Sequence, residues 1–386
     1  MRTTTDRMNA FQINISQAVL DDLQLRLGQT RWSSEVAGAG WHLGTPRSYL
    51  QPLIQYWQYD FDWRKQEAFL NQFAQFKTEL DGYGLHYIHE RGKGDKPMPL
   101  LLSHGWPDSF YRFYKLIPLL TDPAAHGGRA EDAFDVIIPS LPGFGFSDKL
   151  TQKTGGYNTW TANRLHKLMT ETLGYARYGA HGGDVGSGLT EALAMQHADA
   201  LTGIHLCDVP YWRLFATNPD VLSEPEKQYL QDGQQWQMAE GAYALMQATK
   251  PQTLAYGLND SPTGLAAWIA EKFYAWSDCN GAIDSRFTND ELLTNITIYW
   301  ATQTIRSSFA PYWDEPDQQS GEVPRIDVPT GVAIFPKDIV PAPRAFAERF
   351  YNLQHWTELP KGGHFAALEE PELLAQELRD FFRPLR

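Results

Sequence analysis

The chain has 386 residues, of which 42% are hydrophobic and 20% are charged, and this balance indicates a globular protein of one large domain or two smaller ones. Its net charge of −13 disfavours nucleic acid and anionic membranes as partners, and no apolar run has the length of a signal peptide or a transmembrane helix. The two cysteines, Cys207 and Cys279, form neither a disulfide framework nor a metal-ligand cluster. We therefore expect a soluble, cytoplasmic protein without a membrane anchor, a metal or a cofactor.

Helical patterns dominate the first 95 residues. Ser16 can cap a helix over residues 17–27, whose apolar side chains share one face, and Gly28 can end it. Residues 49–76 again show helical spacing with many aromatic side chains, and residues 85–90 have the pattern of a strand.

Short apolar strands then alternate with turns and helices. The predicted strands cover residues 99–103, 134–139, 175–180 and 202–206, and each ends in a turn that carries glycine, proline or an acidic residue. Strands that alternate with helices predict a mostly parallel sheet. Because the carboxyl ends of such strands share one edge, these turns should face one crevice.

Longer helical stretches follow, and we expect them at residues 224–235, 241–248, 264–275 and 289–307, before a strand at 330–335 and a closing helix at 371–382. A helical block between strands indicates a cap, inserted after the sixth strand. The predicted organisation is an N-terminal extension (1–95), a first core part (96–208), a cap (209–313) and a second core part (314–386).

Residues 182–186 read Gly-Gly-Asp-Val-Gly between a predicted strand and a predicted helix at 187–201. This is the spacing of a nucleophile elbow, in which glycines two before and two after the central residue permit a sharp, crowded turn. Asp184 at the centre would attack an electrophilic carbon and form an ester that water must then break. Taken alone, these five residues are equally compatible with a surface aspartate in a glycine-rich turn.

An aspartate nucleophile needs a base that activates water and an acid that orients the base. His364 lies in a glycine-rich loop before the last helix, and Asp338 follows the strand at 330–335, so both fit the chain order nucleophile, acid, histidine. Asp208 is the alternative acid. Each residue also has a purely structural alternative. His364 could only cap the last helix, and Asp338 could be an ordinary loop carboxylate.

The turn at residues 104–107 reads His-Gly-Trp-Pro. The backbone N–H groups of Trp106 and Val185 could form an oxyanion hole, and Pro107 permits a cis bond after Trp106. We interpret His181 and His104 as packing or loop-bracing residues, with His104 as a support for the oxyanion turn.

Together, His-Gly-Trp-Pro, Gly-Gly-Asp-x-Gly-Ser, Phe-Pro-Lys-Asp and Gly-Gly-His-Phe-Ala-Ala resemble the microsomal-type epoxide hydrolases of the α/β-hydrolase superfamily, from about Phe11 to the C-terminus. The resemblance implies an α/β-hydrolase fold, with Asp184 as nucleophile, His364 as base and Asp338 as charge-relay acid. It also implies that two cap tyrosines, Tyr243 and Tyr312, donate hydrogen bonds to the epoxide oxygen.

The chain departs from this family in two ways. Animal members carry an N-terminal membrane helix that is missing here, and many members have tryptophan where Val185 stands. A small apolar epoxide and water are the expected substrates, and a homodimer is left open. The alternatives are a haloalkane or haloacid dehalogenase on the same triad, disfavoured because the side chain of Val185 has no N–H for a halide, and a binding protein without activity. A serine esterase is disfavoured because the chain has no Gly-x-Ser-x-Gly.

Overall fold

A nine-stranded sheet forms the centre of the molecule in the computed structural model, which describes residues 8–314 and 324–386. Its order is β1-β2-β3-β5-β4-β6-β7-β8-β9. The three pairs β1–β2, β2–β3 and β3–β5 are antiparallel, and the other five pairs, which join β5, β4, β6, β7, β8 and β9 in that order, are parallel. The strands are β1 (Asn9–Ala10), β2 (Gln75–Leu80), β3 (Tyr83–Glu90), β4 (Met98–Ser103), β5 (Phe134–Pro139), β6 (Tyr178–Gly182), β7 (Leu201–Leu206), β8 (Ile326–Ile334) and β9 (Tyr351–Glu358).

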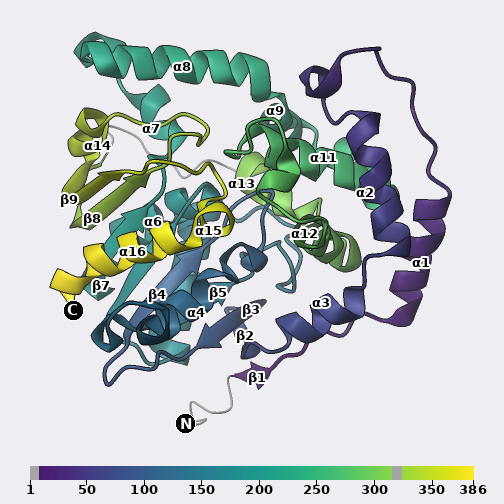
Figure 1. The fold of residues 1–386 in the computed structure, drawn as a ribbon. Coiled ribbons are helices and arrows are strands. Elements are labelled where there is room, and N and C mark those ends of the chain that lie inside the picture. The colour runs from purple at the N-terminus through teal and green to yellow at the C-terminus, as the bar shows by residue number, and fades with distance from the viewer. Residues whose placement is uncertain (1–7, 315–323) are drawn as a thin grey trace.

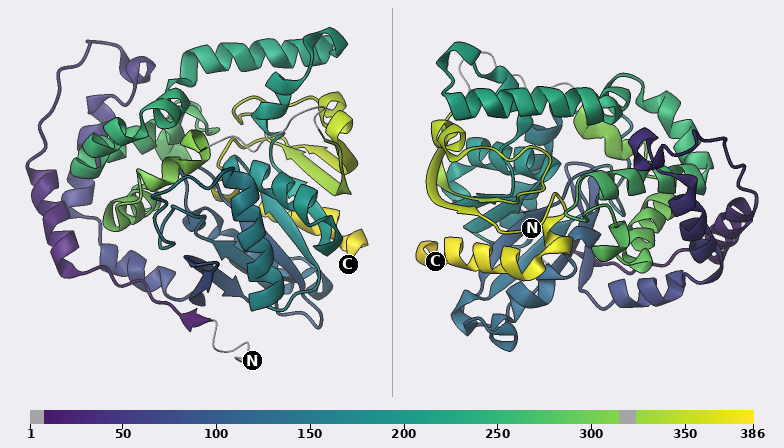
Figure 2. Two further views of the ribbon diagram at one scale, coloured as in Figure 1. Left: turned by 180° about the vertical axis from the view of Figure 1, so that it is seen from behind. Right: turned by 45° about the horizontal axis from the view of Figure 1, so that its top comes forward.

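Helices cover both faces of this sheet. Helices α4 (Leu116–Thr121) and α16 (Pro371–Phe382) pack together on the face turned to the viewer in Figure 1, and α5 (Tyr157–Lys167) and α6 (Val185–Gln196) pack together on the other face, seen from behind in Figure 2. Every residue of β5 is buried, as expected of a parallel strand between two helical layers. Two short helices, α14 (Arg344–Phe350) and α15 (Ala366–Glu369), complete this part of the fold.

A helical block lies between β7 and β8, above the carboxyl ends of the strands, with α8 running across the top of the molecule in Figure 1. The cap therefore follows β7, which is the sixth strand if the two-residue β1 is left out of the count. Its helices are α7 (Tyr211–Ala216), α8 (Glu224–Glu240), α9 (Ala242–Thr249), α10 (Pro251–Asp260), α11 (Pro262–Ala275), α12 (Asn289–Thr302) and α13 (Ala310–Trp313).

The N-terminal region contributes both to the sheet and to the outer side of this block. Strands β1 to β3 extend the sheet, whereas α1 (Gln17–Gly28), α2 (Arg47–Tyr59) and α3 (Trp63–Leu70) contact α11 and α12. Figure 1 shows these purple and blue helices beside the green ones. The side chain of Ser16 makes no capping hydrogen bond, although α1 starts as predicted and ends at Gly28, one residue later than predicted.

The prediction of one helix-like stretch over residues 49–76 was wrong. Helix α2 ends at Tyr59, and α3 begins after Asp62, whose carboxylate accepts a hydrogen bond from the Lys65 amide (3.2 Å). The last residues of the stretch belong to strand β2, which pairs with β3. Both helices bury one apolar face, and the helical spacing of apolar residues therefore continues from α2 into α3. This periodicity alone did not mark the boundary between the two helices.

Several other predicted boundaries shifted. Helix α6 ends at Gln196, and four residues separate it from β7, whereas the prediction extended it to 201. Helix α12 ends at Thr302 because Gln303 adopts a left-handed conformation (φ 53°). The prediction omitted β1, β2, β9, α4, α5, α7, α10, α13, α14 and α15. Within residues 8–314 and 324–386, no helix is both long and apolar enough to span a membrane.

Candidate active site

Asp184 lies at the turn between β6 and α6, where its φ of 59° is a left-handed value that is rare for a residue with a side chain. The turn is tight. A Cβ atom at Gly186 would lie 2.1 Å from the carbonyl oxygen of Ser103, and one at Gly105 would lie 2.2 Å from Oδ1 of Asp184. Glycine at these two positions therefore allows the elbow to approach β4 and the 104–107 turn to approach the carboxylate.

The carboxylate of Asp184 is surrounded by groups that favour its ionised form. The backbone N–H of Trp106 donates a hydrogen bond to Oδ1 (2.8 Å), and Nε2 of His364 lies 3.4 Å from Oδ2. Burial raises the pKa of Asp184, but His364 and the N–H groups of Trp106 and Val185 outweigh this effect and lower it below the ordinary value. The nucleophile predicted from the sequence is therefore ionised at neutral pH and lies against both predicted oxyanion donors.

The predicted base and acid form a buried pair. Nδ1 of His364 lies 2.7 Å from Oδ1 of Asp338, and the side chains of the two residues are 3% and 9% exposed. Burial lowers the pKa of His364, but the charges of Asp338 and Asp184 and their contacts raise it to about 10. Nε2 of His364 makes no well-aligned hydrogen bond among the described residues and faces Oδ2 of Asp184 at 3.4 Å, so the protonated imidazole and this carboxylate form an ion pair.

The alternative acid, Asp208, contacts the backbone of the elbow. Its Oδ1 accepts hydrogen bonds from the backbone N–H of Asp184 (3.0 Å) and the hydroxyl of Ser187 (2.5 Å). Burial and the neighbouring carboxylate of Asp338 raise the pKa of Asp208 to about 7. Asp208 therefore braces the elbow backbone, and Asp338 is the carboxylate hydrogen-bonded to His364.

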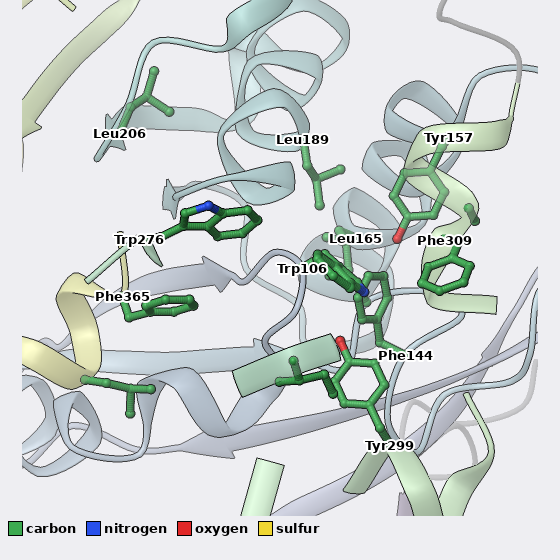
Figure 3. Packing of buried hydrophobic residues seen from close by; sticks show 14 of the residues in the cluster. Trp106, Phe144, Tyr157, Leu165, Leu189, Leu206, Trp276, Tyr299, Phe309 and Phe365 are labelled. Carbon is green, nitrogen blue, oxygen red and sulfur yellow. The ribbon is translucent and has the colours of Figure 1, made fainter. Parts of the chain in front are cut away.

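The two predicted tyrosines come from the cap and meet above the 104–107 turn. The ring of Tyr243 in α9 stacks on Trp106 (centroids 5.2 Å apart, 12° between planes), and the ring of Tyr312 in α13 lies 5.9 Å from that of Tyr243. Figure 3 shows Trp106 between Trp276 and Phe309 in the surrounding apolar packing. Burial, Tyr243 and the charge of Asp184 raise the pKa of Tyr312 well above its ordinary value, so its hydroxyl remains protonated and can donate.

The histidine of the 104–107 turn is fixed in one tautomer. Nε2 of His104 accepts a hydrogen bond from the Leu141 amide (3.2 Å), which leaves Nδ1 to donate to the carbonyl oxygen of Gly105 (3.0 Å). Burial lowers the pKa of His104 to about 3, so this histidine is neutral. It supports the turn that presents the Trp106 amide, and the Trp106–Pro107 bond is cis. His181 instead lies in β6, where its Nδ1 is 3.0 Å from Nδ1 of His205.

A cavity of about 310 Å³ opens onto these groups. Asp184, Asp338 and His364 line it together with Tyr243 and Tyr312. Its remaining walls are mostly apolar or aromatic, and they include Val185, Val209, Pro210, Trp212, Trp236, Ala244, Pro311, Ile334, Phe335, Ile339, Val340, Pro341 and Ala342. This composition is typical of a pocket for a small apolar ligand with a few polar groups at one end.

Two charged residues directly behind the site, Arg112 and Asp108, were not predicted from the sequence. Arg112 donates hydrogen bonds to the carboxylate of Asp108 and to the backbone carbonyl of His364. The i,i+4 spacing of Asp108 and Arg112, just after the 104–107 turn, is a signal that could have been noticed. Their link to His364 spans 252 residues of sequence and needs the folded chain.

Comparison with known proteins places the chain in a family. Residues 8–113 match the family described as "Epoxide hydrolase N terminus", and residues 98–255 match "alpha/beta hydrolase fold". The chain is 47% identical to a candidate epoxide hydrolase of Stigmatella aurantiaca (97% of this chain, 85% of that protein) and 37% identical to epoxide hydrolase 1 of Sus scrofa (97% and 88%).

Two solved structures also share the fold over nearly the whole chain. The epoxide hydrolase of Aspergillus niger superposes with a TM-score of 0.83 (29% identity, 98% of this chain and 96% of that one). The juvenile hormone epoxide hydrolase of Bombyx mori gives 0.84 (29% identity, 99% and 96%). These matches confirm the resemblance and the fold class predicted from the sequence. The chain belongs to the epoxide hydrolase family of the α/β-hydrolase fold, and it is an enzyme of the hydrolase class.

Proposed function

We propose that the enzyme converts an epoxide and water into a vicinal diol through a covalent ester on Asp184. The observation that carries this proposal is the position of the Asp184 carboxylate, which lies between the amide of Trp106 (2.8 Å) and Nε2 of His364 (3.4 Å). We also propose that the chain is divided into an N-terminal extension (1–95), a core in two parts (96–208 and 314–386) and a cap (209–313). Residues 1–7 and 315–323 of this division lie outside the described residues.

In the first step, an oxygen of Asp184 attacks an oxirane carbon, and the bond between that carbon and the epoxide oxygen breaks. The hydroxyls of Tyr243 and Tyr312 donate hydrogen bonds to the oxygen as its negative charge develops. Since the raised pKa of Tyr312 keeps its hydroxyl protonated, it is a donor throughout the neutral range. The alkoxide takes a proton from a tyrosine hydroxyl, and the proton held by His364 then restores that hydroxyl, which leaves a neutral imidazole.

In the second step, His364 takes a proton from water, and the water oxygen attacks Cγ of Asp184. The N–H groups of Trp106 and Val185 stabilise the oxyanion that forms. The bond between Cγ and the alkyl oxygen then breaks, the second proton of the water passes to that oxygen to give the diol, and the water oxygen stays in the carboxylate. The proton remains on His364, and the starting state is restored.

The electrostatics of the site support this order of events. The negative charges of Asp184 and Asp338 both raise the pKa of His364. Ester formation removes the charge of Asp184, so the pKa of His364 must fall in the intermediate. The imidazole thus becomes a base at the moment when water has to be activated.

The substrate that fits the cavity of about 310 Å³ is a small, largely apolar epoxide. A panel of terminal, styrene-type and disubstituted epoxides, with Asp184→Ala as the control, tests the proposal. Diol formation by the wild type and none by the variant is expected. The same panel should include chloroalkanes and bromoalkanes, because halide release would favour the dehalogenase alternative in spite of Val185.

A further inference from the structure

Arg112 lies directly beneath the active site and is almost completely buried, with 3% of its side chain exposed. It follows the 104–107 turn in the short helix formed by residues 110–113. Its guanidinium donates hydrogen bonds to the carboxylate of Asp108 and to the carbonyl oxygen of His364. Arg112 therefore connects the turn that carries the Trp106 amide with the loop that carries the predicted base.

The loop around His364 is fixed on its N–H side by other groups. The amide of His364 donates to the carbonyl oxygen of Trp276 (2.8 Å), and the amides of Gly363 and Phe365 donate to the two oxygens of Glu369 (3.1 and 3.0 Å). The carbonyl of His364 accepts from Arg112 instead. Arg112 thus holds the peptide group that directly follows the imidazole-bearing Cα atom.

The segment at the other end of Arg112 is itself anchored by the cap helix α12. The hydroxyl of Tyr299 donates to the carbonyl oxygen of Asp108 (2.5 Å), and the side chain of Asn295 donates to the carbonyl oxygen of Pro107 (2.8 Å). Arg112 therefore ties the loop that carries His364 to a segment that α12 already fixes. The position of Arg112 can thus determine the position of His364.

The chemistry of the side chain suits this role. Burial lowers the pKa of Arg112, but Asp108, Cys207 and Asp184 outweigh it and raise the pKa, so the group remains charged. A guanidinium is planar and can bind two acceptors in fixed directions, whereas a lysine ammonium is a point charge on a flexible stem. Arginine is thus the residue that can connect a carboxylate and a carbonyl with defined geometry.

We propose that Arg112 is a positioning residue for ester hydrolysis, the second step of the reaction. It fixes the imidazole of His364 next to the ester carbonyl, which the amide of Trp106 binds. This inference rests on the proposed function. Arg112 makes no hydrogen bond to residues 182–186 in the described parts of the chain. Its loss should therefore slow ester hydrolysis, which needs a placed imidazole, more than ester formation, which needs Asp184 and the tyrosines.

The test compares both rate constants by rapid-quench single turnovers with styrene oxide. Arg112→Met is combined with Asp108→Asn, because a lone buried carboxylate would destabilise the fold. We expect ester hydrolysis to fall by about ten- to a hundredfold while ester formation stays within about threefold, and Arg112→Lys to restore part of the loss. The matched control removes an arginine–carboxylate pair outside the site with Arg383→Met and Asp132→Asn, and should change neither rate constant.

Equal decreases of both rate constants, or none, in a double variant that melts near the wild-type temperature would overturn the role of Arg112. A wild-type enzyme that forms diol without a trapped ester would instead refute the proposed function. The two failures are therefore distinguishable. An increase in trapped ester that is specific to the Arg112 variants supports the inference.

Discussion

Nε2 of His364 lies 3.4 Å from Oδ2 of Asp184, while Nδ1 of the same ring lies 2.7 Å from Oδ1 of Asp338. One imidazole thus lies between two carboxylates in a buried site, and their charges, working against burial, raise its pKa to about 10. Since only one of these carboxylates becomes an ester in the proposed reaction, the basicity of His364 is coupled to the progress of the reaction.

Replacement of the base should separate the two steps. His364→Gln removes the proton acceptor but leaves Asp184 in place, so the ester should form and then persist. We expect hydrolysis to slow by about 10²- to 10⁴-fold. Mass spectrometry of the quenched enzyme should show one substrate mass added to the peptide that contains Asp184, and Asp184→Ala should show none. Rapid release of diol by His364→Gln would contradict the role of the histidine.

The cap tyrosines should act on the first step. Tyr243→Phe and Tyr312→Phe each remove one hydrogen-bond donor to the developing alkoxide, and each should slow ester formation by about 10²-fold. The double variant should be slower than either. Tyr256→Phe is the matched control, because Tyr256 is 71% exposed on α10 and should have no effect. Pre-steady-state kinetics would measure the rate constant of ester formation. If the single variants formed the ester as fast as Tyr256→Phe, the role of Tyr243 and Tyr312 as hydrogen-bond donors would be excluded.

The raised pKa of His364 also predicts how stability depends on pH. In the unfolded chain, the pKa of a histidine is about 6.5. Between pH 6.5 and the folded-state pKa of about 10, the folded state therefore holds a proton on His364 that the unfolded state lacks. The contribution of His364 to the free energy of unfolding is therefore complete below about pH 6.5 and is lost as the pH rises to about 10. Urea unfolding at several pH values should show the gap between wild type and His364→Gln shrinking with pH. A gap that stays constant would contradict the raised pKa.

The elbow should tolerate no side chain at Gly186. An added Cβ would lie 2.1 Å from the Ser103 carbonyl oxygen, so Gly186→Ala should lower the free energy of unfolding by about 1–3 kcal/mol or more and reduce activity. Gly257 in α10 offers the opposite case, because nothing lies within 4 Å of an added Cβ. Gly257→Ala should be neutral or stabilise by up to about 1 kcal/mol. Denaturant unfolding of both variants provides the measurement, and equal effects would refute the packing argument.

The parts of this molecule that could be predicted are those encoded by local patterns. The elbow at Asp184 and the glycine loop at His364 each lie within five residues, and the strand, turn and helix around them follow the same short-range rules. The structure brings these residues together with Asp338, Tyr243 and Tyr312, in the arrangement that the family resemblance implied. Their catalytic roles remain predictions.

The parts that escaped prediction depend on contacts between distant residues or on weak patterns. Strand β9 is mostly half-buried and has no long apolar run, and it is recognisable only by its pairing with β8. The break between α2 and α3 is marked by Asp62, whose capping role requires the next helix to be known. Arg112 looks like an ordinary surface arginine until His364 is placed beside it.

A single turnover in ¹⁸O-water distinguishes hydrolysis through an Asp184 ester from direct attack of water on the epoxide. With enzyme in excess over epoxide, water should attack Cγ of Asp184 in the only turnover that occurs. The covalent mechanism predicts that ¹⁸O appears in the peptide that contains Asp184 and that the first diol released is unlabelled. Label in the diol together with an unlabelled Asp184 would show that water attacks the epoxide directly, and it would contradict the covalent mechanism.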